Sequence, residues 1–500
     1  MLLGAAFLWE SVALLALVAF VPLLVALDHV GRAARRPLRG FLVAGWTFGF
    51  AWFLVGMHWV AQLSPVAITV PWLKYPAWVA AAAYLAVFPA LAALIAGFVV
   101  RRGPAALAFA FPCVFLAVEE VRGSGELGFP WFQPGYALHA HPRVLQLASL
   151  GSVSLVTAWV LVVNALVWRA LAGRARGRAL LGAALALGFA WSWGGAALKA
   201  TPKSDPARPA IALVQGDIGS EMKWTGNHQA EILARFVSLT VAGDTLRPKP
   251  AIAIWPETAT GSYLRKQIDQ AIVVVELASR TGVPVFSGFA DYAFDSAGVM
   301  HHYNAAGVFA PDGSMGRIYG KRHLVPFGER MPFEWLLPGL AKVDLGQAEW
   351  TPGPEAVLFP VPGLGPFACL ICFESIFPDL SRESVRAGAQ WLVNITNDEW
   401  FGNGPALPQH AAMAQFRAVE NHVPLARCAN TGITEIVDSA GRVTARLPVF
   451  RAGVLVHPLP PRGRPTPYTR LGDWPGVAAL IASGLLLLLA FARRHAAVVP

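Results

Sequence analysis

The sequence predicts a polytopic α-helical membrane domain joined to an α/β domain. Three observations support this fold class. Long apolar segments occupy most of the first 200 residues, another lies near the C-terminus, and short β-type runs alternate with helical stretches between them. The 500 residues are 55% hydrophobic and 14% charged, a composition unusual for a soluble protein.

Seven apolar segments are each close to the length of about 18 to 20 residues that crosses a bilayer. The first lacks the basic start of a signal peptide, and Asp28 and several arginines follow it directly, so we expect a retained anchor rather than a cleaved leader. Residues 1–198 thus form a domain of about six spans, and 474–493 a last helix. The predicted spans are 8–27, 40–62, 76–100, 104–120, 146–168, 179–197 and 474–492.

The connections between these segments alternate in charge. The positive-inside rule places the arginine-rich connections in the cytoplasm and the region between the last two spans on the other side. A cytoplasmic position for that region would require an odd number of miscounted spans. The arginine-rich side carries 12 basic residues (Arg32, Arg35, Arg36, Arg39, Arg101, Arg102, Arg169, Arg174, Arg176, Arg178, Arg493 and Arg494), and the other side carries Lys74, Arg122 and Arg143.

The net charge of +10 does not indicate a nucleic-acid partner. Residues 201–460 hold 21 Lys and Arg against 24 Asp and Glu, and the remaining residues hold 19 against 6. The basic excess therefore belongs to the apolar segments, where it sets orientation. Because no basic stripe or readout motif is present, we expect no nucleic acid to bind.

Residues 119–131 do not form a clean span. Glu119, Glu120 and Arg122 would close a helix near the membrane interface. The aromatic residues that follow suit headgroup depth, either in an interfacial loop without a substrate role or in the wall of a lipid site. These aromatic residues are Phe129, Trp131, Phe132 and Tyr136.

A polar, proline-containing linker at 199–208 precedes the α/β domain, which we place at 207–460. A domain of this size can bury its own core, and the alternation of strands and helices indicates layers. The predicted strands are 211–214, 251–255, 283–286, 305–309, 367–371 and 391–395, and the predicted helices include 229–242, 266–281 and 410–422.

Three reactive side chains each follow a strand-like run: Glu257, Lys321 and Cys372. Such groups can converge at one edge of a sheet. A thiol is a good nucleophile only as the thiolate, so Cys372 needs either a base, which the Glu257 carboxylate can supply, or a positive neighbour such as Lys321 that holds the thiolate. The Lys321 ammonium and the Phe373 N–H can stabilise a developing oxyanion. This set predicts covalent acyl chemistry. Because membrane segments flank the domain on both sides, a lipid is the expected source of the acyl group.

Four cysteines in 500 residues are not a disulfide framework. Cys369 and Cys372 form a CxxC, which also occurs in redox and zinc sites. Side chains alternate along a strand, so residues three apart point in opposite directions, and no second Cys or His pair completes a zinc site. We therefore expect one structural and one functional cysteine. Without a metal-ligand cluster or a nucleotide-binding loop, no cofactor is expected.

Several segments resemble the nitrilase, or carbon–nitrogen hydrolase, superfamily, which combines an αββα sandwich with a Glu–Lys–Cys triad. With its spans, the chain is similar to the apolipoprotein N-acyltransferase family of the bacterial inner membrane. The resemblance rests on GFPW (128–131), VQGDI (214–218), KW (223–224), WPET (255–258), KRHLVPFGE (321–329), ICFE (371–374), NDEWFG (397–402), PQH (408–410) and NTGIT (430–434).

The resemblance implies roles for particular residues. Glu257 would be the general base, Lys321 the transition-state stabiliser and Cys372 the nucleophile that carries the acyl group. Glu329 would support them as a second carboxylate. Three further residues match positions near the family's active site: Trp224, Glu374 and Trp400.

The implied reaction has two steps and needs no cofactor. A membrane phospholipid would donate its acyl chain to Cys372, and the N-terminal amine of a diacylglyceryl-cysteine apolipoprotein would accept it. The bilayer would be a partner throughout, with the α/β domain facing the periplasm. Apolar, glycine-bearing segments at 331–340 and 399–408 are either lids at the membrane surface or ordinary packed loops.

The chain departs from the family in three respects. Phe373 replaces the tyrosine that usually follows the cysteine, which removes a hydroxyl. Glu399 replaces an alanine and adds a charge to a loop that we expect to be mobile. The family typically has eight spans, and seven are counted here.

Two other functions use the same residues. A membrane-tethered amidase or nitrilase would act on a small soluble amide, with the spans as an anchor only. A lipoprotein-binding scaffold would keep the triad without using it. Several spans and aromatic interfacial residues favour acyl transfer, because one span suffices to tether.

Overall fold

The computed structural model describes residues 1–33, 36–64, 70–103, 105–173, 175–337, 339 and 348–496, without the side chains of 494–496. Arg35, Arg174, the Arg494 side chain, and Pro338 and Leu340 of the expected 331–340 loop lie outside the described residues. The chain forms two compact units. The helical unit comprises Met1–Gln62, Val70–Ala200 and Thr466–Pro500, and the α/β unit comprises Leu63–Thr69 and Thr201–Pro465.

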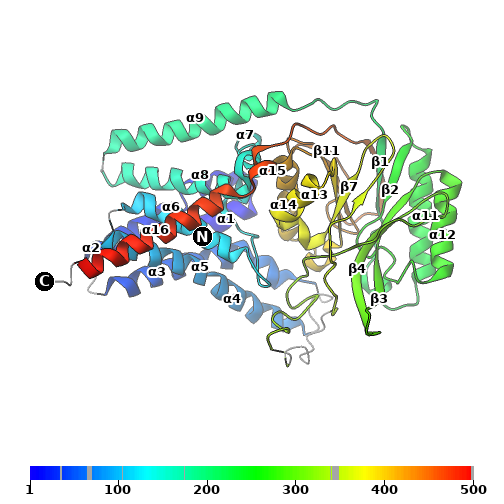
Figure 1. Ribbon diagram of the computed structural model, residues 1–500, viewed down its shortest axis with the longest axis horizontal. Helices are drawn as coiled ribbons and strands as arrows, with labels where there is room; N and C mark the ends of the chain where they lie inside the picture. Colours follow the sequence, from blue (N-terminus) through cyan, green and yellow to red (C-terminus); the bar gives the residue numbers. More distant parts are fainter. Residues whose placement is uncertain are drawn as a thin grey trace. The chain divides into compact units, whose positions relative to one another are not determined.

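The helical unit contains long apolar helices that pack side by side (Figure 1). Its elements are α1 (Leu2–Leu8), η1 (Glu10–Leu17), α2 (Val21–Ala33), α3 (Pro37–Gly56), η2 (His58–Gln62), α4 (Lys74–Leu85), α5 (Val87–Arg102), α6 (Leu107–Arg122), η4 (Pro134–Leu138), α7 (Pro142–Leu145), α8 (Ala148–Leu171), α9 (Arg176–Ala200), α15 (Pro467–Leu471) and α16 (Trp474–Ala496). Among the described residues, six stretches are long and apolar enough to cross a membrane: Glu10–Ala33, Pro37–Gln62, Pro71–Arg102, Ala148–Leu171, Arg176–Ala200 and Trp474–Arg493. They coincide with six of the seven predicted spans.

The predicted span at 104–120 forms α6, which has 16 residues and is not among these six. A helix of this length rises about 24 Å, against about 30 Å for the hydrocarbon core of a bilayer. The helix lies slightly further along the chain than the predicted span, because Ala105 and Ala106 are not helical and the helix continues to Arg122. Nevertheless α6 runs from the end of α5 to a region where its Glu120 accepts a hydrogen bond from Ser154, in the second turn of α8 (2.9 Å).

Three of the four aromatic residues after α6 are buried inside the helical unit, and Phe129 is half-buried. Trp131, Phe132 and Tyr136 are each at most 3% exposed. The Phe132 ring meets the rings of Phe7 and Phe53 edge to face. Packing within the protein, rather than exposure to lipid headgroups, therefore holds these aromatic side chains in place.

The α/β unit contains two six-stranded mixed sheets. In each sheet three central parallel strands are flanked by antiparallel ones. The first sheet has the order β12 (Gly453–Pro458), β1 (Ala210–Gln215), β2 (Pro250–Ile254), β3 (Val285–Phe294), β4 (Met300–Phe309), β5 (Tyr319–Gly320). The second has the order β11 (Val443–Arg446), β10 (Glu435–Val437), β9 (Leu425–Ala429), β8 (Trp391–Thr396), β7 (Phe367–Ile371), β6 (Leu358–Phe359).

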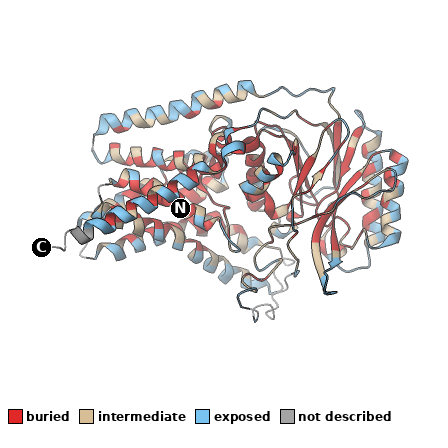
Figure 2. Ribbon diagram, in the orientation of Figure 1, coloured by how far each residue is buried: buried red, intermediate tan, exposed pale blue. Residues whose placement is uncertain are grey.

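Helices cover the outer faces of both sheets, which makes the unit an αββα sandwich. Alternation along β1 shows why: Ile211 and Leu213 enter the core between the sheets, whereas Ala212 and Val214 pack against helices. Figure 2 shows the corresponding pattern, with buried strands and exposed outer faces on the helices. The helices are α11 (Gln229–Thr245) and α12 (Ile268–Thr281) on the first sheet and α13 (Pro378–Arg386) and α14 (Ala406–Asn421) on the second.

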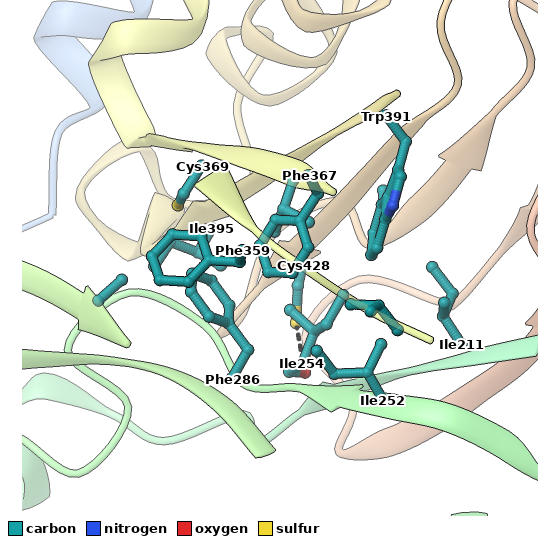
Figure 3. Packing of buried hydrophobic residues seen from close by; sticks show 14 of the residues in the cluster. Ile211, Ile252, Ile254, Phe286, Phe359, Phe367, Cys369, Trp391, Ile395 and Cys428 are labelled. Carbon is teal, nitrogen blue, oxygen red and sulfur yellow. Dashed lines mark hydrogen bonds between the residues drawn. The ribbon is translucent and has the colours of Figure 1, made fainter. Parts of the chain in front are cut away.

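Large apolar side chains from both sheets fill the space between them (Figure 3). A hydrogen bond from Cys428 Sγ to the Ile254 carbonyl oxygen (3.2 Å) links the second sheet to the first. The predicted αββα fold, its six strands and its three helices are confirmed, whereas β6, β9 to β12, α10 (Ser220–Lys223) and α13 were not predicted. The labelled core residues include Ile211, Ile252, Phe286, Phe359, Phe367, Trp391 and Ile395.

Candidate active site

The ends of three strands supply the reactive groups of the α/β unit. Glu257 follows β2 by three residues, Lys321 follows β5 directly, and Cys372 follows β7 directly. Both Glu257 and Lys321 are buried, and Cys372 is half-buried. Strand ends therefore carry the side chains on which the sequence prediction depends.

Two carboxylates, those of Glu257 and Glu329, lie close to the Lys321 ammonium. Lys321 Nζ lies 2.8 Å from Glu329 Oε1 and 3.6 Å from Glu257 Oε1. Asn304, on β4, donates through Nδ2 to Glu257 Oε1 (2.7 Å) and to Glu329 Oε1 (3.3 Å). The Asn397 N–H donates to Glu257 Oε2 (2.8 Å). The two carboxylates are thus fixed by hydrogen bonds at both ends of the cluster.

The charges around Lys321 keep its amine protonated. Burial lowers the pKa of Lys321, but the carboxylates of Glu329 and Glu257 and the Cys372 sulfur outweigh this effect and leave it above its ordinary value. Lys321 is therefore a permanent cation beside Cys372, suited to stabilise negative charge on sulfur or on an oxyanion.

Cys372 occupies a sharp turn after β7. Its φ of +51° lies in the left-handed region, which costs a non-glycine residue about 1–3 kcal/mol. Burial raises the pKa of the Cys372 thiol, and Glu257 raises it further, while Lys321 lowers it. The thiol is therefore protonated at neutral pH and needs a base during attack. Cys369, by contrast, is fully buried in the core between the sheets (Figure 3), whereas Cys372 is half-buried and packs against the same core.

Glu374 ties the turn at Cys372 to the segment that carries Lys321. Its Oε2 accepts a hydrogen bond from the Ile371 N–H (2.7 Å). Its Oε1 accepts bonds from the Arg322 N–H (2.6 Å), the His323 N–H (3.2 Å) and the Tyr319 hydroxyl (2.8 Å). This buried carboxylate holds two segments about 50 residues apart in the chain in one arrangement.

A second buried network, which the sequence did not predict, fixes the carbonyl of Cys372. The Ser375 hydroxyl donates to this oxygen (2.9 Å), and His410 Nε2 lies 3.1 Å from it and donates in the tautomer that carries the hydrogen on Nε2. His410 Nδ1 lies 3.1 Å from Asp398 Oδ1, and Arg427 donates to Asp398 Oδ2 (2.8 Å). Asp398 and His410 stand in the matched NDEWFG and PQH segments, so the sequence marked the positions without indicating their contacts.

A buried lysine, Lys223, supports the main chain at Glu257. Its Nζ donates to the Glu257 carbonyl oxygen (3.2 Å). Burial lowers the pKa of Lys223 to about 8, against the opposing effect of nearby carboxylates. The sequence marked Lys223 only as part of the KW pair. Asn304 carried no sequence signal beyond being a polar residue within a strand.

Glu399, which we expected to add a charge to a mobile loop, has hydrogen-bond partners within the protein. It accepts hydrogen bonds from the Ser220 N–H (2.8 Å) and the Ser220 hydroxyl. The expected mobile charge instead fastens η7 (Asp398–Phe401) to the start of α10 (Ser220–Lys223). The sequence alone did not reveal these hydrogen bonds, because Ser220 and Glu399 are 179 residues apart in the chain.

The remaining predicted residues differ in exposure and surroundings. Trp224 and Trp400 are 45% and 40% exposed. The Phe373 ring packs against Phe377 (5.2 Å between centroids) and lies near His323 (6.0 Å). Burial, with the nearby Lys321 cation, lowers the pKa of His323 to about 4, so His323 is neutral near pH 7.

The arrangement combines a carboxylate base, a permanent cation and a thiol. Such a set performs nucleophilic catalysis through a covalent acyl intermediate. In the part of the chain that the structure describes, no group of three or more His, Cys, Asp or Glu is placed to hold a metal ion.

Comparisons with known proteins show which families this chain resembles. The family model for carbon-nitrogen hydrolase matches residues 210–468, and that for the apolipoprotein N-acyltransferase N-terminal domain matches residues 1–166. An apolipoprotein N-acyltransferase of Geobacter metallireducens is 32% identical over 99% of this chain and 94% of its own length. One from Brucella melitensis is 35% identical over 87% and 84%, respectively.

A solved structure, Nit3 of Saccharomyces cerevisiae from the nitrilase superfamily, covers 51% of this chain and 90% of its own at 19% identity, with a TM-score of 0.39. The family assignment rests instead on the two family models and on relatives that match nearly the whole chain. The chain therefore belongs to the apolipoprotein N-acyltransferase family, an enzyme family whose catalytic domain is a carbon–nitrogen hydrolase.

Proposed function

We propose that this protein transfers a fatty acyl chain from a membrane phospholipid to the N-terminal amine of a diacylglyceryl-cysteine apolipoprotein. The observation that carries the proposal is the Lys321 cation, held 2.8 Å from Glu329 and 3.6 Å from Glu257 and electrostatically coupled to the Cys372 thiol. The family to which the chain belongs supplies the substrate classes. We assign the catalytic part to residues 207–460.

In the first step Glu257 takes the proton of the Cys372 thiol, and the sulfur attacks the ester carbonyl of the phospholipid. The Lys321 ammonium stabilises the oxyanion. The C–O bond breaks, and the leaving oxygen takes the proton from Glu257. The products are a thioester on Cys372 and a lysophospholipid.

In the second step the free amine of the apolipoprotein attacks the thioester carbonyl. A C–N bond forms, the C–S bond breaks, and the amine proton passes through Glu257 to the sulfur, which restores the thiol. Water must be kept from the thioester, since hydrolysis would release a free fatty acid instead.

We place the α/β unit on the periplasmic side of a bacterial inner membrane. The arginine-rich connections on the opposite side support this orientation. Exposed apolar side chains in the α/β unit support contact with lipid: Phe327, Trp335, Leu336 and Leu337 are each at least 50% exposed. Surfaces of this kind mark lipid or protein contacts.

The proposal is tested by intact mass spectrometry of the purified protein after incubation with phospholipid. We expect one fatty-acyl adduct, removed by hydroxylamine, absent in Cys372→Ala and retained in the control Cys113→Ala. Turnover of soluble amides without a lipid adduct would instead indicate a tethered amidase. Lipoprotein maturation unaffected by Cys372→Ala would indicate a scaffold.

A further inference from the structure

A second site of polar chemistry lies in the helical unit, apart from every residue of the candidate active site. A cavity of about 620 Å³ opens among helix ends. The last turns of α2, α5 and α8 and the first turns of α3 and α6 line it. These five helices contact one another in a closed ring, α2 to α3 to α5 to α6 to α8 and back to α2.

The cavity carries an unbalanced positive charge. Among the described residues that line it, Arg32, Arg101 and Arg169 come from three different helices, and Asp28 is the one carboxylate. Asp28 pairs with Arg32, with 3.2 Å between Arg32 Nε and Asp28 Oδ1. Three guanidinium groups thus share the described lining with one carboxylate, and Arg101 and Arg169 supply the excess positive charge.

These two guanidinium groups have different surroundings. Arg101 Nη1 donates to the Gly31 carbonyl oxygen at 3.2 Å, which leaves its other N–H groups for a ligand. Within the described part of the chain, the Arg169 side chain makes no hydrogen bond or ion pair. Arginines that only orient the protein in the membrane need no particular arrangement within a connection. Arg32, Arg101 and Arg169 instead line one cavity, which suggests that they bind a ligand.

The rest of the lining is apolar. Leu27, Phe41, Val100, Leu107 and Trp168 contribute to the walls. In addition, Ala106, Leu107 and Ala108 at the start of α6 line the cavity, so the positive end of this helix lies beside it. A fitting ligand thus has a compact anionic group and adjoining hydrocarbon.

We propose that this cavity binds the phosphate of an anionic phospholipid. Guanidinium groups bind phosphate through paired hydrogen bonds, and basic pockets between membrane helices bind anionic headgroups. Free phosphate shares the headgroup's charge, but the apolar walls favour a ligand that brings hydrocarbon. A neighbouring cavity of about 350 Å³, lined by Arg36, Arg39, Arg101 and Arg102, extends the cationic surface.

Native mass spectrometry of the full-length protein in a nonionic detergent tests the proposal. The probes are dioleoyl-phosphatidylglycerol, dioleoyl-phosphatidylcholine and inorganic phosphate. We expect the protein to bind phosphatidylglycerol about tenfold more tightly than phosphatidylcholine. The Arg101→Gln, Arg169→Gln double variant should bind phosphatidylglycerol about tenfold more weakly than the unchanged protein, because charge-assisted hydrogen bonds to the phosphate are removed. Inorganic phosphate in equal amount should not displace the lipid.

A matched control carries the same change of charge outside the cavity: Arg176→Gln with Arg178→Gln, both exposed at the start of α9. We expect it to bind phosphatidylglycerol like the unchanged protein. Equal losses in both double variants would overturn the proposal in favour of diffuse surface charge, and displacement by phosphate would overturn the lipid assignment.

If the double variant fails to fold, Arg169→Gln alone serves as the test, because the Arg169 side chain makes no hydrogen bond or ion pair with the described residues. Unchanged affinity of Arg169→Gln for phosphatidylglycerol would also overturn the proposal. Formation of the Cys372 acyl adduct reports on the proposed function separately, so either proposal can fail alone.

Discussion

The thiol of Cys372 is a weak nucleophile at rest. Burial and the Glu257 carboxylate both raise its pKa, and the Lys321 cation opposes them without prevailing. Glu257 therefore has two opposite effects in our proposal: its charge disfavours the resting thiolate, and its basicity removes the proton during attack. A site of this kind limits thiolate-dependent side reactions until a substrate is in place.

This balance predicts that Glu257→Gln separates reactivity from catalysis. Removing the negative charge lowers the pKa of Cys372, so alkylation by iodoacetamide at pH 8 should become about 3- to 10-fold faster, since one pKa unit changes the thiolate fraction about tenfold. Acyl-enzyme formation should nevertheless be lost. Alkylation is followed by mass spectrometry, with Cys372→Ala as the blank. Slower alkylation in Glu257→Gln would contradict the electrostatic account.

His323 gives a pH prediction at the same scale. Its pKa is lowered from about 6.5 to about 4, so the unfolded chain binds the proton at higher pH than the folded one. Stability should therefore fall as pH drops from 6.5 towards 4. His323→Phe should flatten this dependence in melting curves recorded at several pH values, relative to the exposed control His228→Phe; an unchanged slope would refute the assignment.

At the scale of elements, the site depends on short segments held together by buried carboxylates. Glu374 joins the turn after β7 to the segment after β5, and Asp398 with His410 fixes the carbonyl of the same turn. Each carboxylate accepts bonds from groups far apart in the sequence. The turn at Cys372, with its positive φ, is therefore kept in place from two sides.

Glu374→Gln should destabilise the α/β unit by about 1–3 kcal/mol, because an amide NH₂ then faces N–H groups that need an acceptor. The exposed Glu383, which pairs with Arg322 at 2.9 Å, provides the control Glu383→Gln, for which we expect a change below about 1 kcal/mol. Thermal unfolding in detergent measures both, and acyl-adduct formation should slow only in Glu374→Gln. Equal, small shifts in melting temperature for the two variants would show that Glu374 does not hold the segments after β5 and β7 together.

At the scale of the whole molecule, the helical unit has one arginine-rich end. The chain enters α6 at this end, beside the cavity, and leaves it near Ser154 of α8. We infer that α6 completes a seventh pass despite its 16 residues. This pass is needed to put residues 201–465 on the side away from the arginines.

Cysteine labelling with a membrane-impermeant maleimide tests this topology in spheroplasts, in a Cys113→Ala, Cys372→Ala background. Ser124→Cys, just after α6, and Ser204→Cys, after α9, should react in intact spheroplasts. Ala33→Cys and Ala172→Cys should react only after lysis. Protection of Ser124→Cys before lysis would mean that α6 does not cross, and protection of Ser204→Cys would place the α/β unit in the cytoplasm.

The sequence by itself determined the two kinds of architecture and the strand ends that carry Glu257, Lys321 and Cys372. Apolar length and strand alternation are local properties, so they can be found without knowing any contact. Tertiary structure alone decided that Asn304 bridges Glu257 and Glu329, that His410 meets the Cys372 carbonyl, and that three arginines share one cavity. Hydrogen bonds and cavities depend on distances between segments that only the packing of sheets and helices brings together.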